Sequence, residues 1–542
     1  MQLSPSAHTD TFCRNGLPPS QLWPELEFTL PELTYPDRLN AADVLLNATI
    51  DAGGGNRRCL VSATETWHYQ QVADVASQIA AVLTDELGLR PGNRVLLRGP
   101  NNPWFAACFL GVLRAGCVAV PTMPMLRAAE LTSICEIARV QLALCDHRFT
   151  AELDSAAVPG LRIIRFGATD ESDLTVLAAA RTADFDSVQT AADDVAVIGF
   201  TSGTTGRPKA AMHFHRDLLA VADTFSAHLL RPGPDDLFTG TPPLAFAFGL
   251  GALLLFPLRA GAAALLIERA SPAELADHVA AHGATVLSTA PTAYRAMLAA
   301  GKAPQLQGLR RAVSAGEHLP EPTWTEFYQA TGVKIIDGIG STEMLHIFIA
   351  AADDDIRPGS TGIPVPGYSA AVLDTDGKPV PDGEPGRLAV KGPTGCRYLN
   401  DDRQSSYVQN GWNLTGDTYI RDADGYFWYQ ARSDDMIISG GYNIAGPEVE
   451  EVLLTHPDVA ECAVVGVPEE IRGQIVKAYV VLRDGVSGSD SLAVELQDLV
   501  KSRIAPYKYP RAVEFVDLLP RTSTGKVQRF LLRAQAKPTA AR

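Results

Sequence analysis

A segment rich in glycine and hydroxyl side chains, FTSGTTGRPK at 200–209, lies between two apolar stretches. Gly takes positive φ at low cost and Pro lacks a backbone donor, so we expect a turn here rather than a helix or a packed strand. Successive amide groups in such a turn form a concave site for an anion. A polyphosphate is the expected ligand, although the GK[ST] signature of a P-loop is missing, and a polar surface turn is the alternative. The expected phosphate-binding residues are Thr201, Ser202, Gly203, Thr204, Thr205, Gly206 and Lys209.

Two acidic residues stand in loops near apolar runs. Glu343 ends the segment DGIGSTE at 337–343. A carboxylate beside phosphate groups is repelled unless a cation lies between them, and Mg²⁺ prefers one or two carboxylates together with phosphate oxygens. Glu343 is therefore a candidate magnesium ligand, with a solvated side chain at a helix start as the alternative. Asp417, in NLTGDTY, could accept hydrogen bonds from both hydroxyl groups of a ribose, and an ordinary turn residue is the alternative.

A lysine near the C-terminus stands in a loop of the same kind. Lys526 follows a glycine in PRTSTGKVQR, at 520–529, between apolar runs. Its ammonium group could stabilise negative charge that develops on a reacting phosphate. A solvated surface lysine is the alternative, and this loop taken alone favours it.

Short apolar runs alternate with helix-length segments along most of the chain, and this alternation favours parallel sheets covered by helices on both faces. In such sheets ligands bind beyond the carboxyl ends of the strands. The loops that follow residues 200, 313 and 336 are therefore expected to converge on one crevice. The predicted strands of this part of the chain are 94–99, 117–121, 195–200, 263–268, 285–290, 311–316 and 334–340.

The pattern changes near residue 430, where a charged turn at 432–435 separates two segments that look folded. We predict an α/β protein whose large N-terminal domain, residues 1–433, consists of parallel-rich sheets flanked by helices. Residues 434–542 would form a small α+β C-terminal domain of ordinary size. Its predicted strands and helix are 461–467, 476–482, 491–503 and 512–520.

Composition and charge narrow the functional class. The chain has 542 residues, of which 46% are hydrophobic and 20% charged, as is typical of a folded globular protein. Its net charge of −16 argues against nucleic acid as a partner. No apolar stretch is long enough to span a bilayer, and no signal peptide is visible at the N-terminus. The eight cysteines form no CxxC pair and no metal-binding spacing, so we expect free thiols and a cytoplasmic protein.

Together the motifs resemble those of the adenylate-forming superfamily, which contains acyl-CoA synthetases, peptide-synthetase adenylation domains and luciferases. FTSGTTGRPK resembles the phosphate loop of that family, GSTE the loop that meets AMP and Mg²⁺, TGD the ribose-binding loop, RSDDMIISGGYNI the hinge and PRTSTGK the loop of the catalytic lysine. The resemblance implies ATP, Mg²⁺ and coenzyme A. It also implies two half-reactions: a carboxylate attacks the α-phosphate of ATP to give acyl-AMP and pyrophosphate, and after rotation of a mobile small domain a thiol attacks the acyl-AMP.

The resemblance assigns roles to individual residues. Lys526, Thr342 and Glu343 would be catalytic, with Glu343 as the metal ligand. Asp434 would be the hinge residue, and Gly440 and Gly441 would belong to the hinge and coenzyme A region. Besides the phosphate loop, the residues expected around ATP or AMP are Ala315, Gly316, Glu317, Asp337, Gly338, Thr342, Asp417, Arg432 and Lys526.

The aryl-CoA ligases that act on benzoate and 2-aminobenzoate are the subgroup that the segments DGIGSTEMLHIF and TPPLAFAFGLG resemble. In that subgroup the second segment lines the acid pocket. An α-amino acid substrate would need a buried partner for its ammonium group, and 242–258 contains no Asp or Glu, which disfavours amino acid activation. The N-terminal segments resemble the 2-aminobenzoate enzymes more, so 2-aminobenzoate is the expected acid, ahead of benzoate. The expected acid-binding residues are Phe246, Ala247, Phe248, Gly249, Gly340 and His346.

Several alternatives stay open at this point. The thiol could belong to a carrier protein instead of free coenzyme A, but no carrier domain is fused to the chain. The protein could be another acyl-CoA ligase, or a nucleotide-binding protein without activity. The expected partners are the small molecules alone, without nucleic acid or membrane, and a homodimer is one option for the assembly.

Overall fold

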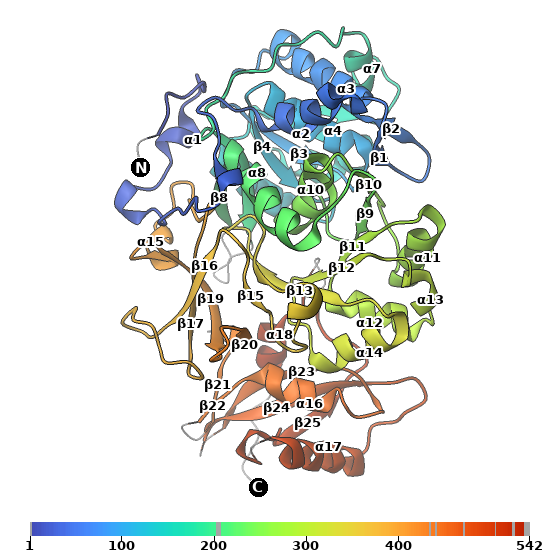
Figure 1. The fold of residues 1–542 in the computed structure, drawn as a ribbon, viewed down its shortest axis with the longest axis vertical. Coiled ribbons are helices and arrows are strands. Elements are labelled where there is room, and N and C mark those ends of the chain that lie inside the picture. The colour runs from blue at the N-terminus through green and yellow to red at the C-terminus, as the bar shows by residue number, and fades with distance from the viewer. Residues whose placement is uncertain are drawn as a thin grey trace.

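The computed structural model describes residues 3–201, 208–432, 435–439, 442–469, 472–504, 506–522 and 526–535. Figure 1 shows a large N-terminal part and, at one end of it, a smaller C-terminal part. This is the division into a large and a small domain that the sequence predicts, although the boundary residue Asp434 lies outside the described residues. Within the described residues no helix has the length and apolar character needed to cross a membrane.

The first sheet of the large domain has six strands in the order β6-β5-β3-β4-β7-β8. All neighbours are parallel except β7 and β8. Its central strands are buried along their whole length, as is typical of a parallel sheet with helices on both faces. The strands are β3 Arg94–Arg98, β4 Val118–Thr122, β5 Leu142–Asp146, β6 Arg162–Phe166, β7 Val195–Thr201 and β8 Lys209–Phe214. Associated helices are α2 Ala41–Thr49, α3 Tyr69–Ala81, α4 Pro103–Arg114, α5 Ala128–Ala138, α6 Ala151–Ala156, α7 Leu174–Ala179 and α8 His215–Val221.

The second sheet has nine strands in the order β15-β14-β13-β12-β11-β9-β10-β1-β2, and it is parallel from β13 to β1. The strands are β1 Arg58–Val61, β2 Thr66–His68, β9 Leu237–Gly240, β10 Ala263–Leu265, β11 Val286–Thr289, β12 Arg311–Ala315, β13 Ile335–Gly340, β14 Ile347–Ala350 and β15 Ile363–Pro364. The helices of this region are α9 Ala247–Leu250, α10 Phe256–Arg259, α11 Pro272–His282, α12 Pro291–Ala299, α13 Ala303–Leu306 and α14 Glu321–Thr331.

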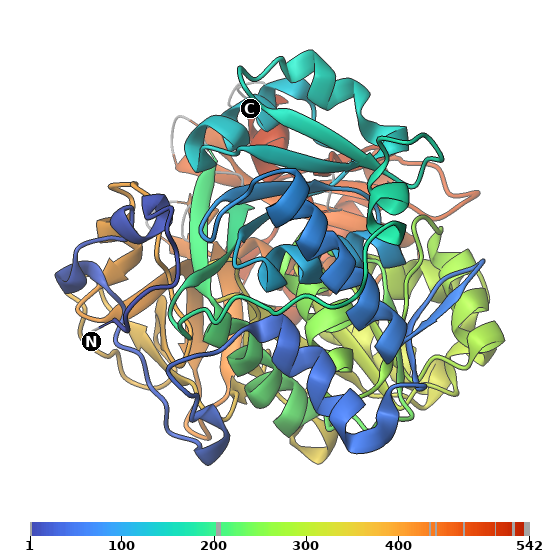
Figure 2. The same ribbon diagram turned by 90° about the horizontal axis from the view of Figure 1, so that it is seen from above.

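A third, antiparallel sheet completes the large domain and was not predicted from the sequence. It contains β16 Ser369–Leu373, β17 Pro385–Lys391, β18 Val408–Gln409, β19 Trp412–Arg421 and β20 Phe427–Arg432, and α15 Gln404–Tyr407 precedes β18. Seen from above, it lies at one side of the molecule with the N-terminal arm against it (Figure 2). The backbone amide of Glu27 donates to the carbonyl of Gly392 over 2.9 Å, which ties the arm to this sheet.

The small domain is built on a three-stranded sheet in the order β23-β24-β25 and a two-stranded hairpin, β21-β22. Its strands are β21 Ile437–Ser439, β22 Tyr442–Ile444, β23 Val459–Glu469, β24 Gly473–Leu482 and β25 Ala512–Phe515. Its helices are α16 Gly446–Leu453, α17 Asp490–Arg503 and α18 Arg529–Gln535. An apolar core that includes Val464, Val476 and Leu496 holds the sheet against the helices, so the predicted α+β unit is confirmed.

The predicted strands and helices agree with the structure in type and order. One detail differs: the segment 200–209 was expected to be a turn throughout, but β7 continues through Thr201 and β8 begins at Lys209. Residues 200 and 201 pair with 210 and 209 across an antiparallel ladder. The ends of the glycine-rich segment are therefore fixed in a sheet, because the ladder satisfies their backbone groups.

Candidate functional site

The ends of β7 and β13 meet, although these strands belong to different sheets. A Cβ atom at Gly199 would lie only 2.8 Å from Cγ2 of Thr342, so a larger residue at position 199 would push the two loops apart. β12 lies beside β13 in parallel, with Ala315 opposite Gly338. The prediction that these loops converge on one crevice is thus confirmed for their described residues.

Glu343 is buried in this crevice and is held by two groups. Nζ of Lys209 lies 3.3 Å from its Oε1 atom, and the hydroxyl of Tyr398 donates to the same oxygen over 2.5 Å. Lys209 also lies 5.0 Å from the centre of the Tyr398 ring, which is the geometry of a cation–π contact. With 6% of its surface exposed, Glu343 is not the solvated side chain of the alternative interpretation.

The neighbouring Thr342 is fixed through its backbone. Its carbonyl oxygen lies 2.7 Å from Nε2 of the buried His213. Burial lowers the pKa of His213 to about 4, so the ring is neutral and donates from Nε2. Leu345, three residues further on, has a φ of 70°. A branched aliphatic residue rarely adopts this left-handed conformation, which marks a turn whose shape is imposed by its surroundings.

Asp417 and Arg432 lie opposite each other on β19 and β20. Nη1 of Arg432 is 3.1 Å from Oδ1 of Asp417. Burial raises the pKa of Asp417, and the charge of Arg432 opposes this shift. Gly416 has a φ of 80°, and a Cβ there would lie 3.0 Å from Nη2 of Arg432. The glycine of the TGD segment therefore allows the guanidinium group to reach the carboxylate.

Lys526 extends from the small domain toward the same crevice. Its Cε atom lies 3.8 Å from the position that a Cβ would take on Gly316, which has a φ of 91°. Desolvation and the nearby charge of Arg432 lower the pKa of Lys526, while Asp417 and Glu317 act in the opposite direction. The side chain keeps contact with solvent in spite of this desolvation, since residue 526 is exposed. Lys526 is therefore brought to the charged residues of the large domain.

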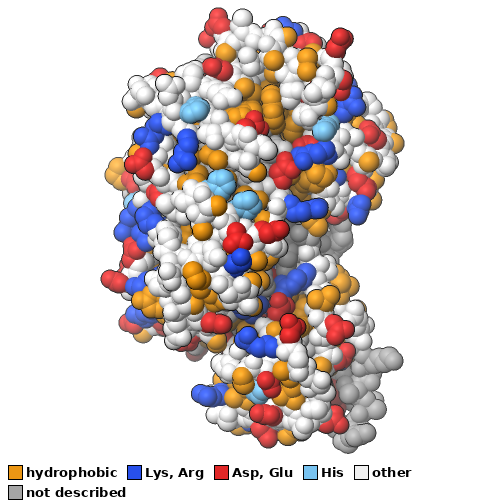
Figure 3. Space-filling view, turned by 90° about the vertical axis from the view of Figure 1, so that its right-hand side faces the viewer, with side chains coloured by type: hydrophobic (Ala, Val, Ile, Leu, Met, Phe, Trp, Pro, Cys, Tyr) orange, Lys and Arg blue, Asp and Glu red, His pale blue; other side chains and the backbone are white. Residues whose placement is uncertain are grey.

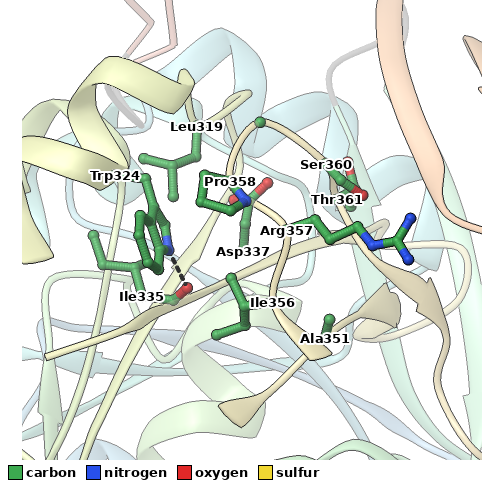
Figure 4. Close-up of a pocket in the computed structure, with 11 residues that line it drawn as sticks. Leu319, Trp324, Ile335, Asp337, Ala351, Ile356, Arg357, Pro358, Ser360 and Thr361 are labelled. Atoms are coloured by element: carbon green, nitrogen blue, oxygen red, sulfur yellow. Dashed lines mark hydrogen bonds between the residues drawn. The ribbon is translucent and has the colours of Figure 1, made fainter. Parts of the chain in front are cut away.

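Asp337, within β13, faces a cavity with one unpaired oxygen. Its Oδ1 atom is buried and has no hydrogen-bond partner in the described part of the chain, and burial raises the pKa of Asp337 to about 7. Figure 4 shows its carboxylate beside Pro358, with Trp324 and its hydrogen bond to the carbonyl of Ile335 to one side. An unpaired acceptor in a cavity of this kind suits an amino group of a ligand.

A second cavity, partly open to solvent, lies beside Thr342. Two of the predicted acid-binding residues, Phe246 and Ala247, contribute to its wall. The polar side chains in the wall are those of His213 and Thr342. The remaining lining residues are Pro121, Val197, Gly199, Phe200, Ala245, Leu250 and Leu345.

The other four predicted acid-binding residues, Phe248, Gly249, Gly340 and His346, do not line this cavity. His346 is 3% exposed and its ring centre lies 4.5 Å from that of Phe256 and 5.8 Å from that of Phe248. Burial lowers the pKa of His346 to about 3. Neither ring nitrogen has a hydrogen-bond partner among the described residues, so His346 forms part of an aromatic cluster behind the cavity.

Some of the remaining predicted residues are described by the structure, and others lie outside the described residues. Ala315 and Gly338 lie on paired strands, and Glu317 forms an ion pair with Arg521 of the small domain.

No group of three or more His, Cys, Asp or Glu side chains in the described part of the chain could hold a metal by itself. The predicted residues that lie outside the described residues are Ser202, Gly203, Thr204, Thr205, Gly206, Asp434, Gly440 and Gly441.

Two protein-family models match most of this chain. The family model described as AMP-binding enzyme matches residues 48–398, and the model of the AMP-binding enzyme C-terminal domain matches residues 448–526. The chain belongs to the AMP-binding enzyme family.

Three relatives place this AMP-binding enzyme in the aryl-CoA ligase subgroup of the adenylate-forming superfamily. The benzoate–CoA ligase of Thauera aromatica is 35% identical over 518 residues, which cover 93% of this chain and 98% of that protein. A crystal structure of an anthranilate CoA ligase with anthranoyl-AMP is 34% identical, has a TM-score of 0.89 and covers 94% and 99% of the two chains. A benzoate CoA ligase from Burkholderia xenovorans LB400 is 32% identical, with a TM-score of 0.84 and coverage of 91% and 100%. The predicted class, an AMP-forming acid–thiol ligase, is confirmed.

Several residues that lie in the crevice of this AMP-binding enzyme were not predicted from its sequence. Tyr398, which donates to Glu343, lies in the segment RYLND and carries no local sign of its role. His213 lies in AAMHFH, four residues after Lys209 of the glycine-rich segment, and this closeness in sequence could have identified it as a site residue. Arg521 lies in the lysine loop that was recognised, but its partner Glu317 is far away in the sequence.

Proposed function

We propose that the protein is an aryl-CoA ligase that adenylates an aromatic carboxylate, with 2-aminobenzoate as the first candidate and benzoate as the second. The observation that carries this proposal is that the cavity lined by Phe246 and Ala247 is also lined by Thr342. A flat ring would occupy the apolar part of the cavity, and its carboxylate would point toward the phosphate-binding loops.

The residues that line the cavity favour an aromatic acid whose ring carries no charged substituent. Its lining residues are apolar apart from His213 and Thr342. The Nε2 atom of His213 is already used by the carbonyl of Thr342. An ammonium or a second carboxylate would be desolvated there without a partner of opposite charge, which is costly. The amino group of 2-aminobenzoate is barely basic and needs no such partner.

The residues around the crevice fit magnesium and ATP. Glu343 receives both of its contacts on Oε1, and a single carboxylate combined with phosphate oxygens is a common arrangement for Mg²⁺. When bound, Mg²⁺ would neutralise charge on the phosphate groups. The carboxylate of Asp417, positioned by Arg432, would accept hydrogen bonds from the ribose hydroxyl groups. Oδ1 of Asp337 would accept from the amino group of adenine.

Lys526 would act where charge develops in the first half-reaction. When the carboxylate of the acid attacks the α-phosphate, negative charge increases on the oxygens between them. An ammonium group already in place stabilises that charge without reorganising solvent. Desolvation and the charge of Arg432 lower the pKa of Lys526, and the neighbouring carboxylates of Asp417 and Glu317 favour its charged form.

For the second half-reaction, we propose free coenzyme A as the thiol. The hinge would lie at Asp434, with Gly440 and Gly441 near the coenzyme A site, and the domains would be 1–433 and 434–542. A phosphopantetheine carrier is the second candidate for the acceptor. All eight cysteines are free thiols, which fits the proposed cytoplasmic location.

Pyrophosphate exchange measured across a panel of acids tests this proposal. We expect ATP–pyrophosphate exchange with 2-aminobenzoate and benzoate and only background exchange with phenylalanine. Faster exchange with a long-chain fatty acid or an α-amino acid than with every aryl acid would refute the proposed substrate class.

The role of Glu343 can be tested through magnesium. Glu343→Gln keeps the shape of the side chain and its acceptor for Tyr398, but it removes the negative charge that would bind the cation. We expect adenylation to need a higher Mg²⁺ concentration and to be slower at saturation. Glu495→Gln, at an exposed acid on α17 of the small domain, serves as the control. A magnesium titration identical to that of the unmodified enzyme would exclude Glu343 as a metal ligand.

A further inference from the structure

One arginine of the small domain is paired with acidic residues on both sides of the domain interface. Nη2 of Arg521 lies 2.8 Å from Oε2 of Glu461 on β23 of the small domain. Its Nη1 lies 3.2 Å from Oε1 of Glu317 in the large domain. The Arg521 side chain is 25% exposed and that of Glu317 is 18% exposed. Because the pair is half-buried, its charges are screened less than those of a surface ion pair.

Arg521 lies on the same small hairpin as Lys526. An isolated antiparallel bridge joins Arg521 to Val527. Across it, the amide of Thr522 donates to the carbonyl of Lys526 over 2.7 Å, and the amide of Lys526 donates to the hydroxyl of Thr522 over 3.1 Å. The backbone positions of residues 521 and 526 are therefore coupled, and a shift of one moves the other.

The two side chains of this hairpin meet neighbouring residues of the large domain. Lys526 lies beside Gly316, and Arg521 is paired with Glu317. Gly316 directly follows β12, so the contact point is fixed by the sheet of the large domain. Figure 3 shows charged side chains of both signs where the small domain meets the large one.

We infer that Arg521 is a positioning residue for the first half-reaction: by bridging Glu317 and Glu461 it fixes the lysine hairpin against residues 315–317, the AMP loop, so that Lys526 reaches the reacting phosphate. The inference rests on the proposed adenylation function. A planar guanidinium group suits this task, because its Nη1 and Nη2 atoms can each bind a carboxylate at the same time in a fixed geometry. Glu461 keeps Arg521 extended, and Glu317 then supplies the docking point.

Arg521 is not the sole contact between the two domains. A separate contact is made by Glu451 of α16, whose Oε1 accepts from the amide of Glu321 over 3.0 Å. This second contact does not involve the lysine hairpin. Removing Arg521 should therefore leave the small domain attached but release the hairpin. In the thioester-forming state the hairpin must leave the AMP loop, so Arg521 contributes to the first half-reaction and not to the second.

The kinetic test compares single-turnover rates for the two half-reactions in Arg521→Gln, Arg521→Lys and a control, Arg503→Gln. Arg503 is exposed at the end of α17, which lies at the far end of the small domain (Figure 1). We expect Arg521→Gln to slow adenylation roughly tenfold, the loss typical of one strong ion contact. Thioester formation from synthetic aryl-AMP should be unchanged or faster. Arg521→Lys should restore part of the adenylation rate, and Arg503→Gln should change neither step.

A double-mutant cycle shows whether Arg521 acts through Glu317. Combined with Glu317→Gln, the change Arg521→Gln should cost little more than Glu317→Gln alone, because the two variants remove the same contact. Additive losses, or equal losses in both half-reactions, would overturn the inference.

A distance measurement separates this inference from the proposed function. Spin labels at Tyr328→Cys on α14 and Val494→Cys on α17, both exposed positions, report the distance between the domains in the full chain without any substrate. We expect Arg521→Gln to broaden the distance distribution and Arg503→Gln to leave it unchanged. If no aryl acid supports exchange but the distribution broadens, the proposed function fails and the bridge stands. An unchanged distribution in Arg521→Gln would reject the bridge whatever the activity.

Discussion

Replacing Lys526 by alanine should reduce the rate of aryl-AMP formation by about 10²–10³-fold, the loss typical of removing one preorganised electrostatic group from a transition state. Lys526 is the cationic side chain that the small domain places beside Gly316, near Asp417 and Glu317. Thioester formation that starts from synthetic aryl-AMP and coenzyme A should fall far less, because no charge then develops at an attacked α-phosphate. Single-turnover rates of both steps provide the measurement.

Lys501→Ala is the matched control for this experiment. Lys501 lies on α17 of the same domain and pairs with Asp498 over 2.8 Å, far from the crevice. It should leave both steps within about twofold of the unmodified enzyme, as expected for a surface ion pair. Equal losses in both half-reactions for Lys526→Ala would show that the lysine serves the fold or a common step rather than adenylation.

Filling the second cavity should abolish most activity toward aryl acids while nucleotide binding is retained. Ala247 is the first residue of α9 and lines this cavity with Phe246 and Leu250. Ala247→Phe would occupy the space proposed for the aromatic ring. Overfilling a packed site costs about 1–3 kcal/mol, which corresponds to roughly 5–160-fold in the specificity constant for the acid. The affinity for ATP should stay within about twofold, since the phosphate loops are not altered.

Ala129→Phe provides the comparison for the cavity experiment, because Ala129 is exposed on α5 and the substitution adds the same ring at the surface. It should leave the acid specificity unchanged. If Ala247→Phe accepts 2-aminobenzoate and benzoate as well as the unmodified enzyme does, the cavity is not the acid site and the ring binds elsewhere.

The sequence predicted those parts of the fold and site that depend on local patterns. The apolar runs within the predicted strands 94–99 and 117–121 indicated buried parallel strands, since both faces of each strand are covered by other elements. The motifs that contain Glu343, Asp417 and Lys526 were identified because glycine and charge at fixed spacing are visible without any tertiary information.

Features that depend on contacts between distant segments were not predicted. The antiparallel sheet of β16 to β20 has partly buried strands whose pairing depends on contacts between segments and not on a local apolar run. Tyr398 reaches Glu343 only through the tertiary fold, where an isolated bridge pairs it with Ala211 of β8. His346 shows the converse: its sequence position suggested the acid pocket, whereas its ring is enclosed by Phe225, Phe248 and Phe256.

The central claim is that the enzyme couples an aryl acid to coenzyme A through an acyl-AMP. The most direct test is to incubate the enzyme with ATP, Mg²⁺, coenzyme A and 2-aminobenzoate or benzoate, and to identify all products by mass spectrometry. We expect AMP, pyrophosphate and the aroyl-CoA thioester in equal amounts, and aryl-AMP when coenzyme A is omitted. Formation of ADP and phosphate, or of no thioester with either acid while an aliphatic acid is converted, would contradict the account.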